Sequence, residues 1–330
     1  MIDVTTQLGI RRVKHPVERR FRTSQPHLRK KRLCGRFYSD TCFFKCKSIR
    51  GDTCAQITGN GKGFCRFWSM KTKSLAHEGL RNFIEMDGIP ENLVVDGSKE
   101  QSHNAWKDTL RTYHVNQSTS EPYSPWQNRA ESEIKMIKIG IKKFTLQCNS
   151  PRSVWCYLGE LISKLRRVTP SLIPSLGGRT PYEDVMGSTP DISALIQFRW
   201  WDLVYFLDSD GDTKLARWMG PAETSGGSDA YWLLPWSCIP IVRSTVWEIP
   251  TEDLEDNMKK EIHNEFNQIV KSKLGDSRTS KGSEIDTNLS PDSWDMFGDD
   301  REDPVMEPVE TEAEQPEDDN YTEETYNNYL

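Results

Sequence analysis

The sequence predicts an α/β fold in which a mixed five-stranded sheet is flanked by helices. Three short runs rich in aromatic and β-branched residues come first, separated by Gly-containing turns, at residues 37–44, 53–58 and 63–68. Helical apolar spacing then alternates with two further short strands, at 93–96 and 114–118. Strands joined by tight turns and strands joined through helices occur in one unit, so the sheet is expected to be mixed.

The helices of this unit are predicted from apolar residues that recur every three or four positions. The first follows Ser74 and ends near Gly88. The second follows Asn128, and its buried stripe is expected to be Ala130, Ile134, Ile137, Ile141 and Phe144. A third spans about 153–168, with Lys164, Arg166 and Arg167 expected on its exposed side.

Charge divides the chain into a basic body and an acidic end. Residues 1–250 carry 36 Lys+Arg against 25 Asp+Glu, whereas residues 251–330 carry 7 against 24. Such a division is typical of a nucleic-acid-binding module joined to a disordered segment. We expect four parts: a flexible basic arm (1–34), an α/β core with a Pro- and Gly-rich connector (35–190), a small all-β domain (191–250) and an acidic disordered tail (251–330).

The all-β part is predicted from five short aromatic or β-branched runs, which favour a small β-barrel-like unit of short strands. The runs are residues 198–201, 203–207, 215–219, 230–234 and 241–249. Its six tryptophans suit either a hydrophobic core or a base-stacking surface, and the core is the default. In the acidic tail, residues 258–273 are expected to form a transient helix at most.

Cysteine usage indicates an intracellular, reduced protein. The eight cysteines form no Cys-x-x-Cys pair, and Cys42 and Cys46 are explained better by buried thiols than by a metal site. No apolar run is long enough to span a membrane, and the amino terminus lacks a secretory apolar region.

Each of three carboxylates lies in, or at one end of, a predicted strand or helix. Asp40 lies in the first strand, Asp96 closes the strand that begins at Leu93, and Glu131 opens a helix. In an open α/β sheet, a functional site forms where such strands end. On its own the helix, with Lys135, Lys138 and Lys142 beside Glu131, would be an ordinary solvated surface. Together the residues indicate metal-binding carboxylates beside a polyanion.

These motifs resemble a known family. Tyr38-Ser39-Asp40, Val95-Asp96-Gly97-Ser98-Lys99-Glu100 and Tyr123-Ser124-Pro125-Trp126-Gln127-Asn128-Arg129-Ala130-Glu131 are similar to the DDE integrases of copia-type (pseudoviridae-like) LTR retrotransposons, over roughly residues 34–249. The resemblance implies an RNase H-like catalytic core and a fragment of a Gag-Pol polyprotein. It also implies that a DNA 3′-hydroxyl is transferred onto a target phosphodiester.

The resemblance assigns roles to particular residues. Asp40, Asp96 and Glu131 become the catalytic residues and the ligands of two Mg²⁺ or Mn²⁺ ions. The DNA contacts it implies are Lys135, Lys138, Lys142, Gln127 and Asn128. The partners are then DNA, as element ends and target duplex, and the resemblance allows a homo-oligomer. Neither a membrane nor a small-molecule cofactor is expected, and the nucleus is the expected place of action.

Two departures from the family keep a second function open. Only 34 residues separate Asp96 from Glu131, without the glycine usual before the glutamate, and one residue turns a helix by about 100°. A His-His-Cys-Cys zinc module is also not found. The alternative is therefore a catalytically defective or domesticated integrase-derived protein that only binds nucleic acid. A cellular RNase H nuclease would show a fourth carboxylate, for which there is no obvious candidate.

Overall fold

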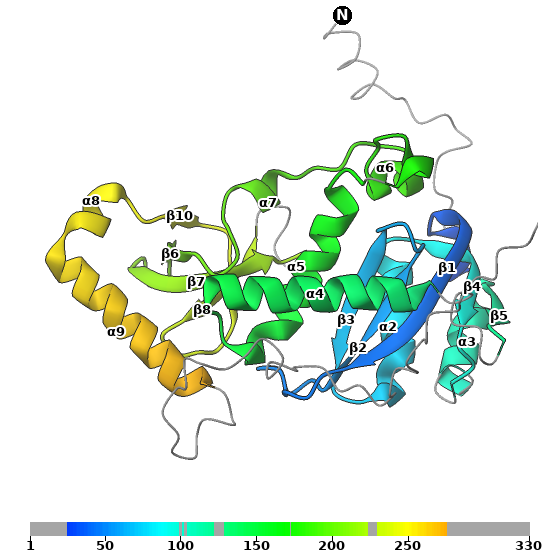
Figure 1. The fold of residues 1–330 in the computed structure, drawn as a ribbon, viewed down its shortest axis with the longest axis horizontal. Coiled ribbons are helices and arrows are strands. Elements are labelled where there is room, and N and C mark those ends of the chain that lie inside the picture. The colour runs from blue at the N-terminus through cyan, green and yellow to red at the C-terminus, as the bar shows by residue number, and fades with distance from the viewer. Residues whose placement is uncertain are drawn as a thin grey trace, which may run out of the picture. The chain divides into compact units, whose positions relative to one another are not determined.

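The computed structural model describes residues 25–98, 101, 104–121, 129–171, 173–223 and 230–275. The first part of the chain forms one sheet and the helices around it (Figure 1). Its strands are β1 Arg32–Phe43, β2 Cys54–Gly59, β3 Cys65–Met70, β4 Ile89–Val95 and β5 Asn116–Thr119. Its helices are α2 Ala76–Met86, α3 Asn104–Tyr113, α4 Ala130–Cys148 and α5 Trp155–Val168.

A second sheet follows, connected by short helices. Its strands are β6 Leu203–Leu207, β7 Thr213–Pro221, β8 Tyr231–Pro235, β9 Ile241–Arg243 and β10 Val246–Glu248. The remaining α-helices are α6 Pro181–Met186, α7 Ser193–Ile196, α8 Thr251–Glu255 and α9 Asn257–Leu274. Single 3-10 turns are η2 Pro26–Leu28, η3 Lys73–Leu75, η6 Arg152–Val154 and η7 Pro174–Leu176.

The first sheet has the mixed topology expected from the sequence. Its strand order is β3-β2-β1-β4-β5, with β1 antiparallel to β2 and parallel to β4, and β4 parallel to β5. Loops without helices join the antiparallel strands, and α2 and α3 form the crossovers between the parallel ones. This is the RNase H-like fold, so the predicted fold class of this part is confirmed.

Alternating side chains of β1 divide the interior into two cores. Leu33 and Phe37 pack with α2 and α3, whereas Cys42 packs with α4 and α5. The core on the α4 and α5 side continues without interruption into the second sheet. Helix α4 lies over β1 and β2 on this side (Figure 1).

The second sheet is antiparallel and open. Its strand order is β10-β6-β7-β8-β9, so the two last strands lie at opposite edges and the expected barrel is not closed. The predicted strand at 198–201 is a turn instead, in which Trp201 adopts a φ of 70°. Trp200, Trp201 and Trp218 are buried in the core, which is the default role that the sequence suggested.

Helix α9 differs from the transient helix expected at residues 258–273. Phe266 and Val270 are buried against the second sheet, and the Phe266 ring meets Trp236 edge-on with centroids 5.2 Å apart. The ordered structure therefore continues to Gly275, and the acidic segment from 276 onward lies outside the described residues. In the part of the chain that the structure describes, no helix is both long and apolar enough to cross a membrane.

We predict that Phe266→Ala destabilises the fold by about 3–5 kcal/mol, because it empties a fully buried aromatic position. Urea unfolding followed by tryptophan fluorescence measures the change. Met258→Ala on the same helix is the control, since Met258 is 75% exposed and should change stability by less than about 0.5 kcal/mol. Equal stability of the two variants would show that α9 does not belong to the folded unit.

Candidate active site

The register of the first sheet brings two of the predicted carboxylates together. Ser39 of β1 lies opposite Val95 of the parallel strand β4, and the next residues along these strands are Asp40 and Asp96. Side chains two positions apart share a face of a strand. Asp40 therefore lies on the face of Tyr38 and Cys42, which is the face that α4 covers.

The start of α4 lies on the same part of the sheet. Ala130, its first residue, packs in a small buried cluster with Tyr38 of β1 and Val94 of β4. Tyr38 and Val94 each precede one of the aspartates by two positions. Glu131, the next residue of α4, is half-buried in the first helical turn. The backbones of Asp40 and Asp96 are thus neighbours on the sheet, and the first turn of α4, which carries Glu131, packs over the same two strands.

Backbone amides orient the two aspartates. The Thr41 N–H donates to Asp40 Oδ1 at 2.7 Å, and the Ser98 N–H donates to Asp96 Oδ1 at 3.0 Å. Gly97, between Asp96 and Ser98, adopts a φ of +78°, and a Cβ atom on Gly97 would lie 2.8 Å from Thr119 Cγ2. Glycine is thus required directly after Asp96 for the chain to turn close to β5.

A buried polar network supports these strands from the opposite face. The Ser39 and Thr58 hydroxyls are 2.7 Å apart, and Gln56 Nε2 donates to Ser39 Oγ at 2.8 Å. Gln101 Nε2 donates to the Ser39 carbonyl oxygen at 3.2 Å, which ties the segment after Asp96 to the strand that carries Asp40. This network could not be predicted from the sequence, because single Ser, Thr and Gln residues carry no signal of burial.

The donor chemistry of the three carboxylates fits a divalent cation, since Mg²⁺ prefers oxygen ligands. The side chains are nevertheless not gathered as a metal centre: within the described ranges, no three His, Cys, Asp or Glu groups lie close enough to hold an ion. Without metal, three neighbouring carboxylates repel one another. The backbone positions of Asp40, Asp96 and Glu131 suit an ion, whereas their side chains are not arranged around one.

The predicted DNA contacts on α4 lie along the flank of Glu131. Lys135 is exposed, while Lys138 and Lys142 are half-buried. Burial raises the pKa of the Cys42 thiol to about 12, and Lys138 lowers this pKa while Asp40 raises it, so both charges lie near Cys42. Lys138 thus faces the same part of the sheet as Asp40. Gln127 and Asn128 lie outside the described residues.

A buried ion pair fixes the rotation of α4, and the sequence analysis did not predict it. Glu133 is 1% exposed, whereas Ile134 and Phe144 of the expected stripe are only half-buried. Glu133 Oε1 accepts from the Gly63 N–H at 2.8 Å, and Glu133 Oε2 accepts from Arg166 Nη2 at 2.6 Å. Because Glu133 must face inward, the flank that carries Glu131 is also fixed.

The hairpin between β2 and β3 packs against the residue before α4. A Cβ atom at Gly61 would lie 2.7 Å from both Cβ and Cδ of Arg129. Gly61 also has a φ of +69°, so the close approach and the turn both require glycine. The start of α4 is therefore held by this hairpin, by α5 and by the sheet.

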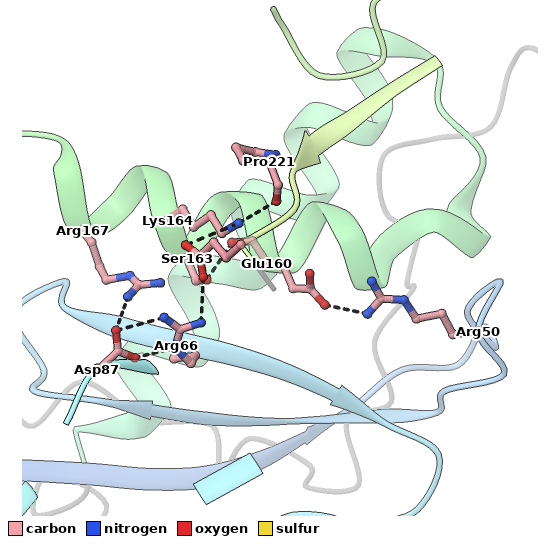
Figure 2. Close-up of polar contacts among 9 residues, drawn as sticks. Arg50, Arg66, Asp87, Glu160, Ser163, Lys164, Arg167 and Pro221 are labelled. Atoms are coloured by element: carbon pink, nitrogen blue, oxygen red, sulfur yellow. Dashed lines mark hydrogen bonds and ion pairs between the residues drawn. The ribbon is translucent and has the colours of Figure 1, made fainter. Parts of the chain in front are cut away.

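The last turn of α5 corrects a further expectation. Lys164, Arg166 and Arg167 were predicted to be exposed, but Lys164 is 9% exposed and Arg167 5%. Asp87, at the end of α2, accepts from Arg167 Nη1 at 2.7 Å and from two nitrogens of Arg66 on β3 (Figure 2). These partners are distant in sequence, so the pattern of a single helix could not reveal them.

The same turn contacts the second sheet. Lys164 Nζ donates to the Pro221 carbonyl oxygen at 2.8 Å, as Figure 2 shows, and lies 3.5 Å from Glu223 Oε1. Arg66 Nη1 donates to Glu223 Oε2 at 3.1 Å. A cavity of about 250 Å³ lies between these groups. Since each cation already has an acceptor, the network serves the structure rather than an external ligand.

This chain is similar to solved structures of known proteins. No protein-family model and no curated protein matches the chain. The HTLV-2 integrase catalytic core domain in complex with magnesium is 17% identical (TM-score 0.34), with 45% of this chain and 93% of that chain covered. The BIV integrase catalytic core domain is 14% identical (TM-score 0.34), with 46% and 93% covered.

A larger share of the chain is covered by a structure of the simian T-cell lymphotropic virus intasome in complex with PP2A regulatory subunit B56 gamma. The identity is 14% and the TM-score 0.38, with 74% of this chain and 91% of that chain covered. The structural neighbours are thus retroviral integrases, and the copia type is not among these three.

We predict that Glu223 makes the stability of the fold acid-sensitive. Burial disfavours its charge, but Lys164, Arg66 and Arg167 together outweigh burial and lower its pKa from 4.5 to about 2. A lowered pKa in the folded state stabilises the protein above pH 4.5, and this contribution is lost as the pH falls from there toward 2.

Urea unfolding at about pH 6 and about pH 3 measures this contribution. Glu223→Gln should be less stable than the wild type at the higher pH, and should lose less stability on acidification. Glu78→Gln is the control, because Glu78 is exposed on α2. The prediction is wrong if wild type and Glu223→Gln lose equal stability between the two pH values.

Proposed function

We propose that this chain is the integrase part of a copia-type retrotransposon polyprotein and joins a DNA 3′-hydroxyl to a target phosphodiester. The packing of Ala130 on Tyr38 and Val94 carries the proposal. This contact joins the first turn of α4 to the strands of the two aspartates, which supports a shared site of residues 40, 96 and 131. The motif resemblance supplies the reaction, since the fold alone does not define it.

Asp40, Asp96 and Glu131 are the residues that would hold Mg²⁺ or Mn²⁺. Two such ions, when bound, would activate the attacking oxygen and stabilise the leaving one. The amides of Thr41 and Ser98 keep one oxygen of each aspartate fixed. The lysine flank of α4 would hold DNA phosphates, and such contacts position the DNA without reading its sequence.

The domain assignment follows from the same proposal. Residues 35–190 would be the catalytic core with its connector, 191–250 the small all-β domain and 1–34 a basic arm that contacts DNA. We place the acidic tail after Gly275, because α8 and α9 fold with the second sheet. DNA is the proposed partner, a homo-oligomer the proposed assembly and the nucleus the proposed place of action.

The second candidate is a protein that keeps the fold and the basic surface without catalysing strand transfer. The observation that favours it is the spacing of 34 residues between Asp96 and Glu131, one fewer than in the family. In that case Lys135, Lys138 and Lys142 would still bind phosphates. The two candidates differ in chemistry but share DNA binding, so they are separated by an assay of joining.

We predict that the purified chain, given Mn²⁺ and a pre-cut DNA end, joins that end to a target duplex. Asp96→Asn should reduce joining to background, because it removes a charged metal ligand while almost preserving volume. Its DNA affinity should equal that of the wild type. Product formation on a sequencing gel measures joining, and fluorescence anisotropy measures binding. Joining by Asp96→Asn at the wild-type rate would overturn the assignment of the catalytic residues.

If the wild type does not join DNA, inserting a glycine between Asn128 and Arg129 decides between the candidates. Recovered joining would identify the short spacing as the defect. A folded, DNA-binding variant that still does not join would support the second candidate.

We predict a different outcome for Lys138→Ala, which removes a proposed phosphate contact and leaves all three carboxylates in the sequence. DNA affinity should fall, and the slope of log affinity against log salt should become shallower by about 0.9, the value of one phosphate contact. Lys259→Ala is the matched control, because Lys259 belongs to α9 instead of α4 and is bound to Asp253 on α8. Equal salt slopes for the two variants would remove Lys138 from the DNA-binding surface.

A further inference from the structure

The outer face of α4 combines apolar and cationic side chains in a way that the proposed catalysis does not use. Met136, Ile139 and Leu146 are 48%, 51% and 46% exposed. They follow one another at spacings of three and seven residues, so they form one stripe along the helix. Lys135 and Lys143 are exposed within and beside this stripe. We call these five residues the outer face of α4.

DNA binding accounts for the lysines of this surface but not for its apolar side chains. Phosphates explain the lysines, but they offer no reason for three large apolar side chains in water. A second copy of α4 explains the apolar residues, but pairing two such helices would bring their lysines together, which is unfavourable. A partner that fits both features is acidic and carries large apolar side chains.

The chain itself contains such a partner beyond the last described residue. Residues 276–330 carry 3 Lys+Arg and 18 Asp+Glu, a net charge of −15. Within them, residues 292–300 read Asp-Ser-Trp-Asp-Met-Phe-Gly-Asp-Asp, with four aspartates, no cation and three large apolar side chains. This composition complements the outer face of α4 in charge and in polarity.

The connection to this segment begins at the core that α4 also covers, because Leu274 of α9 and Ile137 and Ile141 of α4 pack in the same cluster. Residues 276–291 separate the end of the described structure from this segment. A stretch of 16 residues spans up to about 55 Å when extended, which exceeds the length of about 28 Å expected for the 19-residue helix α4.

We propose that residues 292–300 dock on the outer face of α4 of the same chain, with Trp294, Met296 and Phe297 against Met136, Ile139 and Leu146. The aspartates then lie beside the lysines of α4. This contact competes with DNA for Lys135, which belongs to both surfaces, and that consequence rests on the proposed function. The docking itself does not depend on DNA binding or on catalysis.

A second exposed apolar stripe shows why the proposal is specific to α4. Leu254, Met258 and Ile262 are exposed on α8 and α9. Residues 251–262 carry Lys259 and Lys260 but also five carboxylates, so their net negative charge would repel an acidic segment. Apolar exposure is similar on the two surfaces, but only α4 presents it with an excess of lysine.

The test uses the full chain and a zero-length carbodiimide cross-linker, which joins a carboxylate to a lysine amine. We expect mass spectrometry to find cross-links between residues 292–300 and the lysines of α4. Trp294→Ala and Phe297→Ala leave the charge of the segment unchanged, and each should lower the cross-link yield about fivefold through lost apolar contact. Ile139→Gln should have the same effect, whereas Ile262→Gln on α9 should have none.

Two results would overturn the proposal. The first is an unchanged cross-link yield in Trp294→Ala, Phe297→Ala and Ile139→Gln, which would show attraction by charge alone. The second is cross-linking between labelled and unlabelled chains in an isotope-mixed sample, which would show that a second copy occupies the face. In a DNA-binding assay, Trp294→Ala and Ile139→Gln should each raise affinity, and the combined variant no further. If the chain binds no DNA, the proposed function fails while the cross-links still decide the docking.

Discussion

The last turn of α5 is the constraint on which the rest of the described structure depends. Its three cations neutralise carboxylates from three other elements: Arg166 pairs with Glu133 of α4, Arg167 with Asp87 after α2, and Lys164 with Glu223 after β7. Removing one partner of a buried pair leaves an uncompensated charge, which is strongly destabilising. Cations at the end of a helix are also favoured by its dipole. One helical turn thereby joins the two sheets and holds α4.

Much of this fold could be predicted from the sequence, because strand and helix patterns are local properties. The runs around Phe37, Ile57 and Phe67 are strands, and the spacing after Asn128 is a helix, as periodicity indicates. The buried charges could not be predicted in the same way. Arg167 on an amphipathic helix looks solvated until Asp87, eighty positions earlier, is known to lie beside it.

The candidate site shows the same division between local and distant information. The order of Asp40, Asp96 and Glu131 along the chain predicts a shared site. The strand register makes Asp40 and Asp96 neighbours, and Ala130 packs over the same strands. The features that hold the site were not predictable. Glu133 resembles any glutamate in a first helical turn, yet it is buried because Arg166 and the Gly63 amide satisfy its oxygens.

This anchor bears on the short spacing before Glu131. Removing one residue between Asp96 and Glu131 would turn the Glu131 side chain by about 100° only if α4 rotated about its own axis. Rotation would expose Ile137 and Ile141 and would take Glu133 away from Arg166, leaving a buried guanidinium without its carboxylate. These costs are set by contacts along the helix and not by the segment before it. The orientation of Glu131 therefore follows from the packing of α4 and not from the length of the segment before it.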